Sequence, residues 1–264
     1  MSTPANSNPF LEACQLVAKL GGAELMEYRS RFKTREKAPN DLVTDADLAS
    51  QRAIHDQLLQ TFPDHLFLGE ENIDLPMTRN VDSDFRWIVD PLDGTLNYVH
   101  GLQSFSVSVA LQHKGRLIAA AVYDPWLDEM YSADDQSQAT LNGEPISVSD
   151  CKEIPQALGV ISLPSQLTES TPELATFTKL LIESRSVRRL GSAALNLSYI
   201  AAGRLDYYWA TSVKTWDIAA GFLILKQAGG CMLDVSGEAL NLERPVFVAS
   251  SSIELNRALQ TLVQ

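Results

Sequence analysis

The chain has 264 residues, of which 45% are hydrophobic and 20% are charged, and this composition excludes an intrinsically disordered protein. The 33 acidic residues outnumber the 21 basic ones and give a formal net charge of −12. Such a surface repels nucleic-acid backbones and anionic membranes, so neither is expected as a partner.

The first half of the chain predicts two helices followed by a sheet. Asn8 and Pro9 indicate the start of the first helix, because asparagine is a good N-cap and proline suits the first turn. The second helix is predicted to begin near Thr44 and to end before Pro63. The runs that read as strands are 65–69, 85–90, 104–112 and 116–125.

After about residue 150 the pattern alternates between strands and helices, which is typical of an α/β arrangement. The predicted strands are 157–163, 187–190, 205–210 and 245–250. The predicted helices are 173–184, 192–203, 216–230 and a last one after residue 250. We therefore divide the chain into an N-terminal α+β half, residues 1–148, and a C-terminal α/β half, residues 149–264.

The segment with the clearest chemical pattern is DPLDGT, residues 90–95. A strand delivers Asp90, Pro91 cannot continue the hydrogen-bond ladder, and Gly94 permits a close backbone approach to a ligand. Two carboxylates three residues apart repel each other unless a cation lies between them, and hard divalent cations prefer such oxygen ligands. An aspartate-rich turn is the simpler alternative, but it does not explain why a strand, a break and a helix start coincide here.

Three other acidic residues indicate a functional site only when they are considered together with this segment. Glu70 follows the predicted strand 65–69, at the same kind of strand end as Asp90. Asp47 lies in the sequence TDAD, where capping of the second helix is a complete alternative explanation. Asp217 lies in the first turn of a predicted helix, where compensation of the helix dipole is the alternative. Each of these alternatives accounts for its own segment but not for all four segments together.

The cysteines and the first residues bear on location. Cys14, Cys151 and Cys231 form no CxxC pair and show no zinc-binding spacing, so free thiols in a reducing compartment are expected. The opening MSTPANSNPF lacks the basic and apolar regions of a secretory signal, and no apolar run is long enough to span a bilayer. We therefore expect a cytoplasmic protein.

The strings LVTDAD, GEEN, WIVDPLDGTLNYVHG and WDIAAG, with AGG closing the last helix, together resemble the inositol monophosphatase family in order and spacing. The resemblance extends from about residue 10 to the C-terminus. The superfamily also contains fructose bisphosphatases and 3′-phosphonucleotide phosphatases. The resemblance implies a five-layer αβαβα sandwich of the sugar-phosphatase type, a homodimer, and a lithium-sensitive, Mg²⁺-dependent hydrolase of small phosphate monoesters.

The resemblance also implies a ligand set for two to three Mg²⁺ ions. Glu70, Asp90 and the carbonyl of Leu92 would hold the first ion. Asp90, Asp93 and Asp217 would hold the second ion, with Asp90 bridging the two. A loosely held third ion would use Glu70. Two such ions can activate water on one side and stabilise the leaving oxygen on the other, so myo-inositol phosphate would give inositol and phosphate without a covalent intermediate.

The implied catalytic residues are Glu70 and Thr95, which would position the attacking water, and Asp47, which would accept a hydrogen bond from the Thr95 hydroxyl. The family's inositol-binding glutamate falls on Ala210, whose methyl group cannot accept a sugar hydroxyl, so we expect broad substrate tolerance. The residues implied in substrate binding are Asp93, Gly94, Thr95, Gly191, Ser192, Ala193, Ala210 and Asp217.

Three alternatives stay open. The phosphatases that form an aspartyl-phosphate use a DxDxT motif, whereas Asp90 and Asp93 are three residues apart with a proline between them. Another activity of the superfamily, on a 3′-phosphonucleotide, fructose bisphosphate or histidinol phosphate, fits the same motifs. A metal-binding homologue that has lost catalysis is the non-enzyme alternative.

Overall fold

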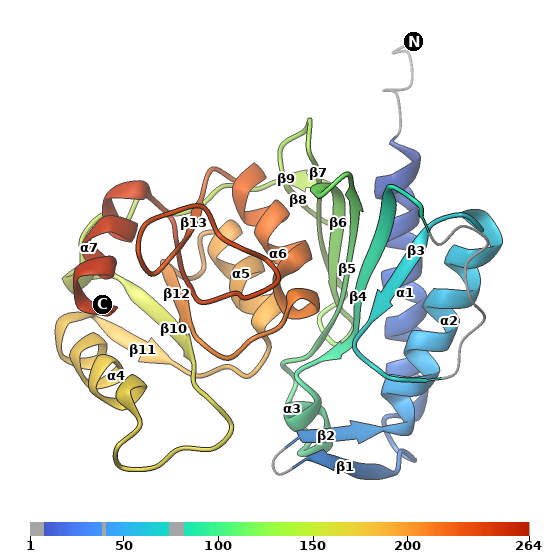
Figure 1. Cartoon of the computed structure of the whole chain (residues 1–264), viewed down its shortest axis with the longest axis horizontal. Helices are drawn as coiled ribbons and strands as arrows, with labels where there is room; N and C mark the ends of the chain where they lie inside the picture. The colour runs from blue at the N-terminus through green and yellow to red at the C-terminus, as the bar shows by residue number, and fades with distance from the viewer. Residues whose placement is uncertain (1–7, 39–40, 74–81, 264) are drawn as a thin grey trace.

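The computed structural model describes residues 8–38, 41–73 and 82–263, which form five alternating layers of helices and sheets (Figure 1). Helices α1 (Pro9–Tyr28) and α2 (Asp45–Thr61) cover one face of a seven-stranded sheet (Figure 1). Helices α5 (Ala193–Ala201) and α6 (Thr215–Gln227) lie between this sheet and a five-stranded sheet. Helices α4 and α7 cover the outer face of the smaller sheet. The αβαβα sandwich expected from the sequence is therefore confirmed.

The two N-terminal helices begin where the sequence predicts them. Helix α1, Pro9–Tyr28, starts after Asn8, whose side-chain oxygen accepts a hydrogen bond from the Phe10 N–H at 3.0 Å. Helix α2, Asp45–Thr61, is capped by Thr44. Between them, β1 (Thr34–Ala38) and β2 (Asp41–Thr44) form a hairpin that the sequence did not predict, because its polar residues show no apolar alternation.

The larger sheet has the strand order β3-β4-β5-β6-β7-β8-β9. Strand β3 is parallel to β4, and the other neighbours are antiparallel. The turn between β5 and β6 places Lys114 and Gly115 at positive φ, as a tight hairpin requires. The strands are β3 (Leu66–Gly69), β4 (Phe85–Asp93), β5 (Ser106–His113), β6 (Arg116–Asp124), β7 (Glu129–Asp134), β8 (Thr140–Leu141) and β9 (Glu144–Pro145).

Both faces of the larger sheet are buried, and alternate residues of β4 serve different cores. Trp87 and Val89 pack with α1 and α2, whereas Ile88 packs with α5 and α6. Because side chains two residues apart on a strand share a face, Asp90 points to the same side as Ile88. The strand therefore aims Asp90 at the middle helical layer.

The smaller sheet has the order β11-β10-β12-β14-β13, in which β10 is parallel to both of its neighbours and β14 is antiparallel to both of its own. Its strands are β10 (Leu158–Ser162), β11 (Ser186–Arg188), β12 (Tyr207–Ala210), β13 (Cys231–Asp234) and β14 (Phe247–Ser250). The remaining helices are α3 (Thr95–Val99), the 3₁₀ turn η1 (Ile154–Gln156), α4 (Pro172–Glu183), α5 (Ala193–Ala201), α6 (Thr215–Gln227) and α7 (Ile253–Val263).

The middle layer joins the two sheets into one hydrophobic core. Ile200 of α5 and Ile224 of α6 belong to the same buried cluster as Ile88 of the larger sheet and Tyr208 of the smaller one. The two sheets thus bury their facing surfaces against the same pair of helices. Within the described ranges, none of the helices is both long and apolar enough to cross a membrane.

Candidate active site

Four carboxylates from three separate segments converge at one end of the larger sheet. Glu70 directly follows β3, Asp90 and Asp93 lie on β4, and Asp217 lies in the first turn of α6. The pKa of Asp90 is raised well above its usual range by burial first, and then by the negative charges of Glu70, Asp93 and Asp217. An effect of this kind requires short distances, so these side chains are neighbours in the fold.

A β-bulge brings Asp90 and Asp93 to the same side. Asp90 is paired with Ser108 and Asp93 with Ser106, so β4 has one residue more than β5 over this stretch. In a regular strand, residues three apart point to opposite faces, and the extra residue reverses that relation. The sequence predicted that Pro91 ends the strand. That prediction was wrong, because β4 continues through the bulge to Asp93.

Asp93 is held by the start of α5. One of its oxygens accepts a hydrogen bond from the Ala193 N–H at 3.0 Å. The other accepts from the Ser192 hydroxyl at 2.5 Å and from the Ala194 N–H at 2.7 Å. Burial outweighs these hydrogen bonds and raises the pKa of Asp93 to about 6. Ser192 and Ala193, two predicted substrate-loop residues, therefore directly contact a predicted metal ligand.

Asp47 contacts both the start of α2 and the Thr95 hydroxyl. One oxygen accepts from the N–H and the hydroxyl of Thr44, at 2.9 and 2.6 Å, and closes a capping box at the start of α2. The other oxygen lies 3.3 Å from the Thr95 hydroxyl, which is also 3.1 Å from the Leu92 carbonyl oxygen. Burial raises the pKa of Asp47 to about 7.

Two predicted glycines occupy backbone positions that favour glycine. Gly94 has a φ of +97°, and a Cβ atom there would lie 3.0 Å from the Ser104 carbonyl oxygen. Gly191 has a φ of +88°, and a Cβ there would lie 2.6 Å from the Asn97 side-chain nitrogen. Asn97 donates hydrogen bonds to the carbonyls of Ser104 and Leu190, at 2.7 and 2.6 Å. Helix α3 is thereby attached to the loop that precedes α5.

Asp217 is one of the four converging carboxylates, whereas Ala210 lies in the hydrophobic core. Asp217 accepts a hydrogen bond from the Lys214 N–H at 2.7 Å, and its pKa is raised to about 8 by burial and by the charge of Asp93. Ala210, the last residue of β12, is fully buried in the shared core, so its methyl group does not reach the site surface. The next residue, Thr211, donates a hydrogen bond at 3.3 Å to Glu173 of α4.

Lys37 is a site residue that the sequence did not reveal. Its ammonium group lies 3.1 Å from a Glu70 oxygen and 2.6 Å from a Glu71 oxygen. Burial lowers the pKa of Lys37, but the two glutamates outweigh this effect and raise it overall. A single lysine in a polar stretch carries no pattern, and only the fold of the β1–β2 hairpin brings it to the carboxylates.

The carboxylates provide the oxygen donors that Mg²⁺ prefers, although the described residues contain no ready-made cluster of three or more acidic, histidine or cysteine ligands. All four carboxylates instead have protein partners: Lys37 for Glu70, the Leu92 N–H for Asp90, the start of α5 for Asp93, and the Lys214 N–H for Asp217. These contacts leave lone pairs available, because each carboxylate has about four acceptor positions. A buried group of mutually repelling carboxylates thus fits a divalent cation in charge and in donor chemistry.

The sequence model of the inositol monophosphatase family matches residues 6–264 of this chain. The chain therefore belongs to this family of metal-dependent phosphatases. It is 39% identical over 234 residues to a Nus factor SuhB from Pasteurella multocida, which covers 87% of this chain and 86% of the relative. It is also 37% identical over 237 residues to an inositol-1-monophosphatase from Rhizobium meliloti, covering 86% of this chain and 85% of the relative.

A solved structure agrees with this assignment. The fold matches the extragenic suppressor protein suhB from Bartonella henselae with a TM-score of 0.90 and 30% sequence identity. The match covers 97% of this chain and 99% of the other. The family predicted from four short motifs is therefore confirmed over nearly the whole length of the chain.

Proposed function

We propose that this protein hydrolyses small phosphate monoesters, inositol monophosphates among them, with Mg²⁺ as its cofactor. The observation that carries the proposal is the convergence of Glu70, Asp90, Asp93 and Asp217, whose negative charges act together on Asp90. In a chain with no cation, such an arrangement is unfavourable. Two to three bound divalent ions would offset the repulsion between these carboxylates.

The proposed ligands are Glu70, Asp90, Asp93, Asp217 and the Leu92 carbonyl. Bound Mg²⁺ supplies the positive charge that lowers the pKa of a water molecule and stabilises the leaving oxygen of the ester. The remaining steps belong to protein groups.

Thr95 is proposed to position the attacking water. Its hydroxyl has one hydrogen, for which the Asp47 carboxylate and the Leu92 carbonyl compete. If the Leu92 carbonyl is used as a ligand, the hydroxyl donates to Asp47, and a Thr95 lone pair then faces the water. Glu70 accepts the second hydrogen of that water. The N–H groups of Gly94 and Thr95 bind the phosphate oxygens. Water attacks phosphorus in line while the bond from phosphorus to the ester oxygen breaks; one proton of that water ends on the phosphate and the other on the departing alcohol.

Substrate tolerance is proposed to be broad, because the phosphate contacts are common to every candidate. The buried Ala210 offers no polar contact to a sugar hydroxyl, and a buried polar contact is what gives large selectivity. Ranking kcat/KM over inositol phosphates, sugar phosphates, fructose bisphosphate, histidinol phosphate and nucleotides tests this. A preference of several hundredfold for inositol 1-phosphate over glycerol 2-phosphate would contradict it, and Ala210→Glu is expected to raise that preference.

The test of the activity itself is phosphate release with and without Mg²⁺. Asp217→Asn should abolish most of the activity, because it removes ligand charge from the site. Asp84→Asn is the matched control, since it removes one charge from a side chain that is 59% exposed and pairs only with Lys114 among the described residues. An Asp217→Asn enzyme with wild-type rates at low and saturating Mg²⁺ would refute the ligand assignment.

A second candidate function is favoured by one observation, the 39% identity to a relative named Nus factor SuhB. In that case the chain has a second role that does not depend on phosphate hydrolysis, whether or not it also keeps the phosphatase activity. Asp217→Asn distinguishes the two, because a role of this kind survives the loss of the ligand and the hydrolase activity does not.

The proposal includes a homodimer and a cytoplasmic location. The family resemblance supports the dimer, and light scattering of the purified protein measures it. Cys14, Cys151 and Cys231 are all free thiols, which supports a reducing compartment. Fractionation of cells that express the chain tests the location.

A further inference from the structure

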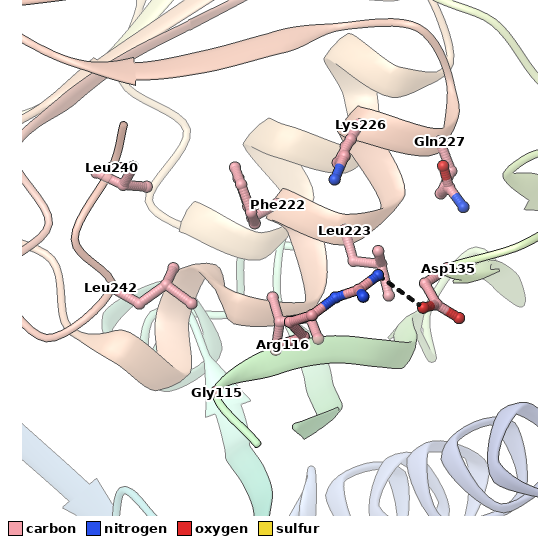
Figure 2. A pocket seen from close by; sticks show the side chains of 10 residues that line it. Gly115, Arg116, Asp135, Phe222, Leu223, Lys226, Gln227, Leu240 and Leu242 are labelled. Carbon is pink, nitrogen blue, oxygen red and sulfur yellow. Dashed lines mark hydrogen bonds and ion pairs between the residues drawn. The ribbon is translucent and has the colours of Figure 1, made fainter. Parts of the chain in front are cut away.

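A pocket of about 270 Å³ opens between the C-terminal part of α6, the turn that joins β5 to β6, and residues 240–242 (Figure 2). It shares no lining residue with the four carboxylates, and on α6 it begins at Phe222, about 8 Å along the helix axis from Asp217. The turn follows His113, which pairs with Phe85 at the end of β4 opposite to Asp93. Ser106 and His113 are seven positions apart on β5, roughly 23 Å at the usual rise, so the pocket lies far from the Asp90–Asp93 end of the sheet.

The pocket has two chemically different ends. Figure 2 shows Phe222, Leu240 and Leu242 on one side, and the side chains of Arg116 and Lys226 on the other. An apolar wall with a few polar groups at one end is the usual lining of a small-molecule site, because the wall supplies affinity and the polar groups fix orientation.

The charged end is positive in a protein whose formal net charge is −12. Arg116 lies 3.4 Å from Asp135, and its side chain is 78% exposed, so this ion pair holds it weakly. Lys226 forms no ion pair with any residue in the described part of the chain. Two cations and one carboxylate leave a net positive charge. Compensation of the α6 dipole explains Lys226 in the last turn, but not the guanidinium and the apolar wall beside it.

We propose that this pocket binds a small organic anion with an apolar body. The anionic head lies between Arg116 and Lys226, and the body packs against Phe222, Leu240 and Leu242. The volume is just below the usual range for ligand sites, so it suits a compact molecule of the size of an aromatic carboxylate. The site is independent of the proposed phosphatase activity, because it shares no residue with the carboxylate cluster.

Benzoate is the probe, and NMR titration of the ¹⁵N-labelled full chain is the measurement. Benzoate should shift the signals of Phe222, Lys226 and Leu240, with a dissociation constant of about 1 mM, as expected for a ligand of this size. Formate tests the head alone and benzyl alcohol tests the body alone, and both should bind several times more weakly. Signals of residues 92–95 should stay unchanged.

Lys226→Gln and Arg116→Gln should each weaken benzoate binding about tenfold, since each removes one charge-assisted contact. Lys114→Gln is the matched control, because it removes a cation two residues from Arg116 that does not line the pocket, and it should leave binding unchanged. Equal binding of benzyl alcohol and benzoate would overturn the proposal. So would shifts confined to residues 92–95, or equal losses in all three variants.

Discussion

Gly94→Ala tests whether the backbone conformation at the centre of the candidate site is specified by its glycine. Gly94 has a φ of +97°, and the added Cβ would lie 3.0 Å from the Ser104 carbonyl oxygen and 3.3 Å from the Phe105 Cα. Both neighbours are backbone atoms, which cannot rotate away. The left-handed conformation costs a residue with a Cβ roughly 1–2 kcal/mol, and overpacking adds about 1–3 kcal/mol.

The free energy of unfolding should therefore fall by about 2–5 kcal/mol, which corresponds to a loss of roughly 5–15 °C in Tm for a chain of this size. Gly115→Ala is the control, because its φ of +79° is also left-handed but a Cβ there meets nothing within 4 Å. It should lose only the conformational part, about 1–2 kcal/mol. Denaturant unfolding and phosphate release are measured for both variants.

The two variants should also differ in catalysis. Relief of the contact at Gly94 moves Thr95, so kcat should fall for Gly94→Ala and stay near the wild-type value for Gly115→Ala. If both variants lost the same free energy of unfolding, the close approach to Ser104 and Phe105 would have no energetic role. The account of Gly94 would then be refuted.

Thr95→Ala should lower kcat by a factor on the order of 10²–10⁴ with a smaller change in KM, because positioned proton acceptors are worth about that much; a normal kcat in steady-state assays would show that the hydroxyl has no part. Li⁺ should inhibit phosphate release, because it carries half the charge of Mg²⁺ at the Asp90–Asp93–Asp217 position, and equal rates in LiCl and NaCl of matched ionic strength would contradict this. Burial lowers the pKa of His65 from 6.5, so the unfolded chain binds its proton more readily and the free energy of unfolding falls as the pH drops below 6.5. His65→Phe should make that loss shallower in urea unfolding between pH 7 and pH 5, whereas the exposed His100→Gln should not.

Much of the fold could be predicted because its signals are local. Asn8 and Thr44 cap α1 and α2 as their side chains indicate, and the alternation of Trp87, Ile88 and Val89 specifies a strand that is buried on both faces. The β1–β2 hairpin has no such signal, because β1 is polar and exposed and β2 has only two apolar residues, and its place is fixed by contacts such as Lys37 with Glu70.

The site was predictable as a set of residues but not as an arrangement. The motifs indicated which carboxylates are candidate metal ligands, because each of them lies at the end of a strand or the start of a helix. They did not indicate that a bulge after Asp90 turns Asp93 toward α5, since a proline such as Pro91 also occurs where a strand stops. Nor did they indicate that Asp93 is held by Ser192, a contact between residues far apart in the chain.

The middle helical layer has a consequence for how the protein is made. The inner face of the larger sheet, with Ile88, Ala110 and Val122, is covered by α5 and α6. The chain leaves the ribosome from its N-terminus, so that face remains uncovered until synthesis has passed Gln227, the end of α6. Between the synthesis of β9, which ends at Pro145, and of α6, the nascent chain therefore carries a broad apolar surface exposed to water. Its last quarter is needed before the sheet made first is protected from aggregation.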